Sequence, residues 1–174
     1  MKALSEAAMI TVPKMLVPVD FSLGSDTSVA YATALAQTLR SEVTLLHVYQ
    51  RSDSMSSIVP GADPVVDDEH DRALAQQWLE GLRAKALKHG DVEMRVVVVS
   101  GSPAEGIISF ARKSSFDMVV MGTHGRTGLR HVLMGSVAEA VVRRASCPVL
   151  TIHFPFRTAT SRVESDTADT RPAR

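Results

Sequence analysis

The chain lacks the features that mark several classes of protein. It has a single cysteine, Cys147, so it cannot form an internal disulfide, which fits a reducing cytoplasm. No apolar run approaches the ~20 residues of a membrane-spanning helix. Ser5 and Glu6 interrupt any signal-peptide core near the amino end. We therefore expect a cytoplasmic protein with no membrane partner.

Net charge is also absent, because 19 Lys and Arg residues balance 19 Asp and Glu residues. A role on nucleic acid or on a membrane surface usually requires a basic excess, so neither partner is expected. The 174 residues are 45% apolar, which is ordinary for one globular domain. The sequence shows no internal repeat and no second domain.

Short apolar runs alternate with amphipathic stretches along the chain. Strands are expected at 15–19, 43–48, 92–99, 117–121 and 148–153, and helices at 22–40, 67–89, 102–113 and 136–145. This alternation predicts a single-domain, open, parallel α/β sheet with helices on both faces, a Rossmann-like fold. We assign 1–13 to an extension, 14–154 to the domain, 155–174 to a disordered tail and 51–66 to a mobile loop near the ligand edge.

Two helices carry more detailed expectations. In the helix at 67–89, Leu74, Trp78, Leu82 and Ala86 recur at i+4 spacing, which places Trp78 in the core. The helix at 102–113 opens with the segment 102–105, Ser-Pro-Ala-Glu, which predicts a serine N-cap and a capping-box acid.

The most informative segment follows the fourth strand. Gly122 and Gly125 are three residues apart, and the pair Gly135-Ser136 follows and opens a helix. Glycine lets backbone N–H groups approach an anion closely, and a helix N-terminus adds unpaired N–H groups and partial positive charge. The alternative is a glycine-rich loop that merely turns and caps the next helix. The strand before it and the helix after it favour a phosphate-binding loop, to which Val137 adds a backbone amide.

Asp20 directly follows the first strand. Ligands in open parallel sheets bind beyond the carboxyl ends of the strands, so Asp20 and the glycine loop can meet there. A carboxylate at this position could accept from ribose hydroxyls or help to hold a divalent cation. It could equally cap the helix after Ser22, and the residues alone leave both roles open.

Five segments together resemble the universal stress protein family: Val17-Pro-Val-Asp20-Phe-Ser22, Leu45-Leu-His-Val48, Val119-Val-Met-Gly-Thr-His-Gly125, Gly135-Ser-Val-Ala138 and Cys147-Pro-Val-Leu150. The resemblance runs unbroken from Lys14 to His153. The spacing Gly-x2-Gly-x9-Gly-Ser is similar to that of the ATP-binding branch. The resemblance implies strand order 3-2-1-4-5, ATP held across strands 1 and 4, and a homodimer through the last strand.

The resemblance also implies a set of binding residues. ATP with Mg²⁺ or Mn²⁺ is expected on Pro18, Val19, Asp20, Val48, Met121, Gly122, Gly125, Arg126, Gly135, Ser136 and Val137, with Asp20 at the metal. His124, Arg130 and His131 lie in or beside the loop, where one or two could screen phosphate charge. His47 is interpreted as a hydrogen-bonded strand-end histidine and Cys147 as a packing residue.

The predicted function is that of a nucleotide-dependent regulatory or protective dimer in a stress response. A slow ATPase and a nucleotide-free interaction module remain as alternatives. The chain contains no Gly-Lys pair, as a Walker A loop requires. It also lacks the acids and lysine of a phosphoacceptor receiver domain, and its glycines follow the fourth strand rather than the first, as an NAD site would need. No general base is evident, so at most slow hydrolysis is expected.

Overall fold

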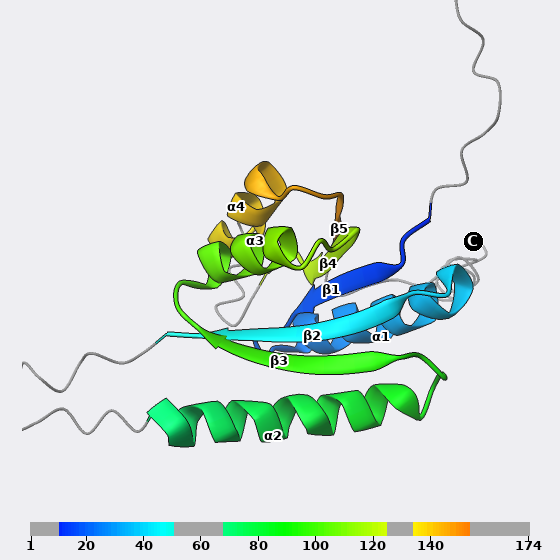
Figure 1. The fold of residues 1–174 in the computed structure, drawn as a ribbon, viewed down its shortest axis with the longest axis horizontal. Coiled ribbons are helices and arrows are strands. Elements are labelled where there is room, and N and C mark those ends of the chain that lie inside the picture. The colour runs from blue at the N-terminus through cyan, green and yellow to red at the C-terminus, as the bar shows by residue number, and fades with distance from the viewer. Residues whose placement is uncertain (1–10, 51–67, 125–133, 154–174) are drawn as a thin grey trace, which may run out of the picture.

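Five parallel strands form one sheet in the order β3-β2-β1-β4-β5 (Figure 1). The computed structural model describes residues 11–50, 68–124 and 134–153. The strands are β1 (Lys14–Pro18), β2 (Glu42–Tyr49), β3 (Met94–Ser100), β4 (Met118–Gly122) and β5 (Val149–Ile152). This architecture confirms the expected α/β fold class and the strand order that the resemblance implied.

Two pairs of helices cover the two faces of the sheet. Helices α1 (Leu23–Leu39) and α2 (Asp68–Leu87) lie on one face, and α3 (Pro103–Lys113) and α4 (Ser136–Arg144) lie on the other (Figure 1). A hydrophobic core lies on each face of the sheet, and alternate side chains of β1 pack into one or the other, because successive residues of a strand point to opposite faces. Met15 is buried against α1 and α2, whereas Leu16 is buried on the side of α3 and α4.

The turn after β1 explains how α1 begins. Ser22 is the N-cap, and its hydroxyl accepts a hydrogen bond from the backbone N–H of Ser25 at 3.3 Å. Pro18 ends the strand, as expected, because proline has no N–H to extend the ladder. Phe21 adopts a left-handed conformation with φ of 61°, which is uncommon for an aromatic residue. The cap expected around 22–26 is therefore present.

The expectation that Trp78 lies in the core is wrong. The residue is 53% exposed, and its ring meets that of Phe21 in a T-shaped arrangement with centroids 5.2 Å apart. The buried residues of α2 are Ala75, Leu79 and Ala86, of which Ala86 belongs to the predicted stripe, and Leu82 packs partly buried against the same core. The helix is rotated from the predicted stripe because the smaller Ala75 and Leu79 fit against the sheet and leave the indole at the boundary.

The capping box expected at the start of α3 is also wrong. Ser102 occupies the N-cap position, but its side chain makes no cap hydrogen bond. The Glu105 carboxylate instead accepts from the Arg144 guanidinium, with Nη2 and Oε2 2.9 Å apart. A partner on α4, distant in sequence, therefore replaces the local capping contact.

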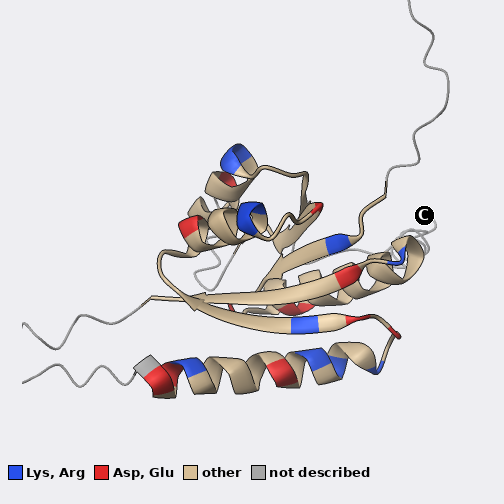
Figure 2. Cartoon of the chain, viewed as in Figure 1, with Lys and Arg blue, Asp and Glu red and all other residues tan. Residues whose placement is uncertain are grey.

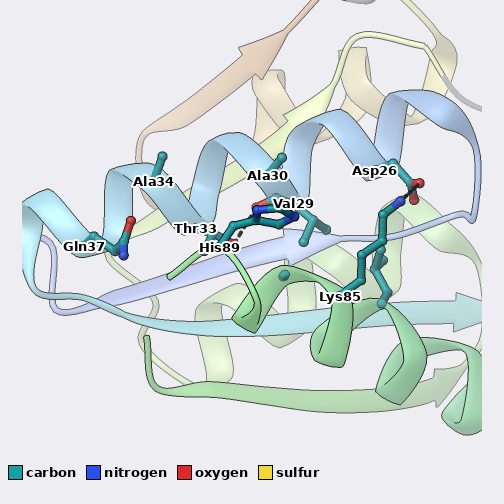
Figure 3. A pocket seen from close by; sticks show the side chains of 10 residues that line it. Asp26, Val29, Ala30, Thr33, Ala34, Gln37, Lys85 and His89 are labelled. Atoms are coloured by element: carbon teal, nitrogen blue, oxygen red, sulfur yellow. Dashed lines mark hydrogen bonds and ion pairs between the residues drawn. The ribbon is translucent and has the colours of Figure 1, made fainter. Parts of the chain in front are cut away.

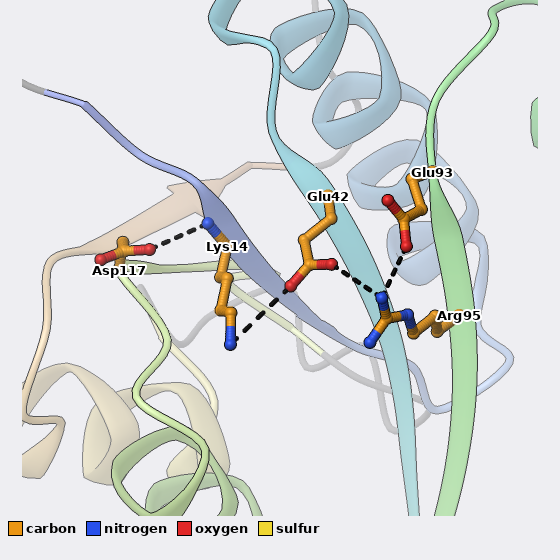
Figure 4. Close-up of polar contacts among 5 residues, drawn as sticks. All are labelled: Lys14, Glu42, Glu93, Arg95 and Asp117. Carbon is orange, nitrogen blue, oxygen red and sulfur yellow. Dashed lines mark hydrogen bonds and ion pairs between the residues drawn. The ribbon is translucent and has the colours of Figure 1, made fainter.

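Charged side chains on the strands are confined to their amino ends (Figure 2). There Glu42 lies 3.9 Å from the Lys14 ammonium and 3.1 Å from the Arg95 guanidinium, which also reaches Glu93 at 2.6 Å (Figure 4). Asp117 accepts from the backbone N–H of Lys14 at 2.9 Å. The carboxyl halves of all five strands carry no Lys, Arg, Asp or Glu, and the site lies at that edge.

Three expectations fall on residues that the structure does not describe. The loop at 51–66, the tail at 155–174 and most of the extension at 1–13 lie outside the described residues. Among the helices that are described, none combines the length and apolar character needed to cross a membrane.

Candidate ligand site at the carboxyl edge of the sheet

A cavity of about 660 Å³ opens beyond the carboxyl ends of β1, β2 and β4, between the first turns of α3 and α4. Its size falls within the range of small-molecule sites. It lies where the strand order reverses between β1 and β4, which is where open α/β sheets bind ligands. Nine predicted site residues line it: Pro18, Val19, Asp20, Val48, Met121, Gly122, Gly135, Ser136 and Val137. The other two, Gly125 and Arg126, lie outside the described residues.

The start of α4 supplies hydrogen-bond donors to this cavity. Gly135 is the N-cap with φ of −71°, and its own N–H donates to the carbonyl of Thr123 at 2.7 Å. The first bond back to the cap is donated by Glu139 N–H, at 2.9 Å. The N–H groups of Ser136 and the next two residues therefore have no acceptor within the helix, as at any helix N-terminus. Gly135 shapes the turn, and the residues after it provide the available donors.

Gly122 lies beside the cavity at a tightly packed position. A Cβ on Gly122 would lie 3.3 Å from the carbonyl oxygen of His124 and 3.6 Å from that of Gly24. A Cβ on Gly24 would likewise lie 3.2 Å from the His124 oxygen. The end of β4 therefore approaches the first turn of α1 at backbone distance, which brings the glycine segment close to Asp20.

Asp20 braces the turn between β1 and α1. Its Oδ1 accepts from the backbone N–H of Ser22 at 3.1 Å, from the Ser22 hydroxyl at 2.6 Å and from the Ser25 hydroxyl. Since Ser22 itself caps α1, Asp20 is not the N-cap. Among the described residues, no group of three or more His, Cys, Asp or Glu could hold a metal ion. A cation at Asp20 would need ligands from a bound molecule, as Mg²⁺ commonly takes from phosphates.

Several lining residues carried no clear signal in the sequence. Ile107 and Pro103 reach the cavity because α3 lies close to β2: a Cβ on Gly106 would meet Val48 Cγ1 at 2.8 Å. His47 also lines the cavity, and its Nδ1 lies 2.7 Å from the carbonyl oxygen of Val19, as expected for a hydrogen-bonded strand-end histidine. Only the close helix-to-strand approach at Gly106 places the α3 residues here.

Thr123 and His124, between the two glycine positions, line the cavity as well. The Thr123 hydroxyl lies 2.9 Å from His124 Nδ1 and 3.3 Å from His153 Nδ1. The first contact joins neighbours in the sequence, whereas His153 reaches the same hydroxyl only because β5 pairs with β4.

A second cavity, of about 210 Å³, lies between α1 and α2 (Figure 3). Its walls are mainly apolar, with the Asp26–Lys85 ion pair at 3.0 Å on one side. Cys147 lies apart from both cavities, and burial raises the pKa of its thiol, with Asp117 adding to the effect. A neutral thiol fits the packing role expected of it.

The fold and the larger cavity define an open α/β protein with a ligand site at its topological switch point. A family model described as the universal stress protein family matches residues 11–153. The chain is 32% identical, over 82% of each chain, to a universal stress protein of Methanocaldococcus jannaschii. It therefore belongs to the universal stress protein family.

Solved structures share the fold. UspA of Lactobacillus plantarum superposes with a TM-score of 0.71 at 25% identity, over 82% of this chain and 99% of that one. A universal stress protein in complex with cAMP superposes with a TM-score of 0.62 at 22% identity, over 83% and 98%.

Proposed function

We propose that the protein binds ATP, together with Mg²⁺ or Mn²⁺, in the cavity at the carboxyl edge of the sheet. The observation that carries this proposal is the convergence of nine predicted residues from β1, β2, β4 and α4 on one cavity. Its location at the reversal of strand order supports the same conclusion. The relative in complex with cAMP holds an adenine nucleotide.

Each part of the cavity wall suits a different part of a nucleotide. The N–H groups at the start of α4 and the Ser136 hydroxyl would bind phosphate oxygens. The apolar side chains of Val48 and Ile107 would contact the base. Asp20 would hold ribose hydroxyls or the cation that accompanies the phosphates.

We further propose that the nucleotide acts in regulation or protection, within a homodimer, rather than as a substrate in rapid turnover. The titratable groups of the described lining are Asp20, His47, Tyr49 and His124. Asp20 Oδ1 accepts from three donors, so this carboxylate oxygen is already engaged in the turn after β1. Slow hydrolysis is the enzymatic alternative, and a nucleotide-free interaction module is the structural one.

Substitution of Gly135 tests whether a phosphate group binds at the start of α4. A Cβ there would lie 3.4 Å from Thr123 O, an ordinary contact, and φ is negative, so the fold should tolerate a side chain. Gly135→Asp places a carboxylate beside the expected phosphate and should weaken ATP binding at least tenfold, by like-charge repulsion worth about 1.4 kcal/mol or more. Isothermal calorimetry measures the affinity, and circular dichroism checks the fold.

Gly135→Asn is the matched control, because it has nearly the same size without the charge. A larger loss with Asp than with Asn supports a phosphate at this position. If Gly135→Asp binds ATP as tightly as the parent, the phosphate is not held here. Mass spectrometry of small molecules released from the purified protein identifies the nucleotide independently, and an empty protein that also fails to bind added ATP supports the interaction module.

A further inference from the structure

Thr123 links the imidazole of His124, at the wall of the larger cavity, to that of His153 at the end of β5. Its Oγ1 lies 2.9 Å from Nδ1 of His124 and 3.3 Å from Nδ1 of His153. The two rings meet edge to face with their centroids 5.8 Å apart. Thr123 is only 8% exposed, so its hydroxyl depends on these protein partners. We call His124, Thr123 and His153 the His–Thr–His unit.

The number of hydrogens in this unit constrains its protonation. A threonine hydroxyl has one hydrogen and can donate it to only one of the two Nδ1 atoms. The other imidazole must therefore donate its own Nδ1–H to the Thr123 oxygen. A proton added at Nε2 of that donating ring leaves both hydrogen bonds intact. The unit can thus take up positive charge without leaving a buried polar group unsatisfied.

The backbone of Thr123 ties this unit to the proposed phosphate site. The Thr123 carbonyl accepts from Gly135 N–H at 2.7 Å, and its N–H donates to the Ile152 carbonyl at 3.0 Å. The unit therefore lies between the start of α4 and the end of β5. His124 lines the same cavity as the first turn of α4, and Thr123 couples it to His153, so an anion bound there would lie in the cavity that this unit borders.

The described wall of the cavity offers no permanently positive side chain to a bound polyanion. The described lining includes no Lys or Arg, and its one carboxylate is Asp20. His47, from β2, contacts a backbone carbonyl through Nδ1, and Glu139, in the first turn of α4, pairs with Arg143 at 2.9 Å. Asp26, on α1, is paired with Lys85. Arg126, Arg130 and His131 lie outside the described residues.

We propose that binding of the nucleotide phosphates takes up a proton at the His–Thr–His unit, so that affinity rises as pH falls through the range in which histidine titrates. This inference rests on the proposed function. A nearby anion favours the protonated form of an imidazole, and by linkage protonation must then strengthen anion binding. For one proton the change is at most about tenfold per pH unit.

Calorimetry of MgATP binding at pH 7, in buffers with different ionisation enthalpies, counts the protons exchanged. The protons exchanged by MgATP itself are the same for every variant, so differences between variants belong to the protein. We expect the parent to take up a larger fraction of a proton than Thr123→Val, which removes the hydroxyl at nearly constant volume. Thr123→Ser should restore the uptake, because it restores the hydroxyl.

Two further variants make the result decisive. His153→Gln changes only the exposed strand end and should lower the uptake even if Thr123→Val fails to fold. His89→Gln removes a histidine that lines the smaller cavity and should leave the proton count unchanged. Equal uptake in the parent, Thr123→Val and His153→Gln, with ATP bound by all three, overturns this inference alone. Absence of ATP binding in the parent overturns the proposed function as well.

Imidazole ¹⁵N chemical shifts provide a readout that a purely structural role would not move. Without nucleotide, one ring of the unit should carry its hydrogen on Nδ1 and the other on Nε2. Saturating MgATP should move the titration midpoint of at least one of these rings to higher pH. Identical titration curves with and without MgATP would contradict the proton uptake.

Discussion

Trp78 and Leu79 are neighbours in the sequence but lie in opposite environments. Trp78 is 53% exposed and makes a T-shaped ring contact with Phe21, whereas Leu79 is fully buried against the sheet. The one-residue difference corresponds to about 100° of rotation on a helix, enough to move a side chain from core to boundary.

Substitution of these two residues should therefore have unequal costs. Leu79→Ala should lower the free energy of unfolding by about 2–5 kcal/mol, because it leaves a cavity in a closed core. Trp78→Ala should cost about 1 kcal/mol, since half of the indole is already in water. Urea unfolding followed by circular dichroism measures both, because Trp78 is the only tryptophan and fluorescence would be lost. Equal losses would contradict the observed rotation of α2.

The interaction between Glu105 and Arg144 belongs to the scale of elements, because it joins α3 to α4. The hydrogen bond from Arg144, followed by its charge, lowers the pKa of Glu105. A lowered carboxyl pKa stabilises the folded state above the ordinary pKa of glutamate, and this stability is lost as pH falls through the lowered value. Both groups are exposed, so the effect is small and sensitive to salt.

Glu105→Gln should consequently lower the melting temperature slightly at pH 7. The difference from the parent should narrow below pH ~4, where the carboxylate becomes protonated. It should also shrink in 1 M salt, which screens exposed charges. Thermal melts at the two pH values and two salt concentrations test this. A difference that grows on acidification would show that the pair does not stabilise the α3–α4 contact.

β5 is an edge of the sheet, and its free side bears on the assembly of the whole molecule. The carbonyls of Pro148 and Ile152 accept from the N–H groups of Val119, in β4, and Thr123, directly after it, at 2.9 and 3.0 Å. Because strand groups alternate in direction, the N–H and C=O of Thr151 point to the open edge. No charged side chain occurs in β5 to discourage pairing with another strand. These features support the proposed homodimer through the last strand.

Proline substitution tests that dimer without breaking the β4–β5 ladder. Thr151→Pro removes an outward N–H and should weaken self-association at least tenfold, as measured by sedimentation equilibrium. Val96→Pro, on the opposite edge strand β3, is the matched control. Glu93 O accepts from Val43 N–H and Gly101 N–H donates to Tyr49 O, so the odd-numbered residues of β3 face β2 and the backbone N–H of Val96 points to the open edge. A parent that sediments as a monomer at micromolar concentration rules the interface out, and so does a dimer indifferent to Thr151→Pro.

Much of the site could be predicted from the sequence because its signals are local. A glycine pair after an apolar run, a Gly-Ser pair at a helix start and an acid after the first strand each follow from short-range backbone chemistry. Parallel strands then bring their carboxyl ends to one edge whatever lies between them. Gly135 and Asp20 were thus predicted to meet without any knowledge of their contacts.

Long-range contacts account for what the sequence could not predict. Ser102 begins α3 without a side-chain cap, and Glu105 binds Arg144, because a guanidinium 39 positions away competes with the local backbone. The rotation of α2 likewise depends on how side chains fit the sheet, which periodicity alone does not distinguish.

By itself the sequence determined the order of strands and helices along the chain, the edge of the sheet that bears the site, and the place there of Gly122, Gly135, Ser136 and Asp20. These follow from periodicity and turn chemistry within a few neighbouring residues. Only the tertiary structure decided that Trp78 lies at the surface, that Ser22 rather than Asp20 caps α1, and that one Thr123 hydroxyl contacts two imidazoles. Those features join residues that the chain brings together only when β4, β5 and the helices pack against one another.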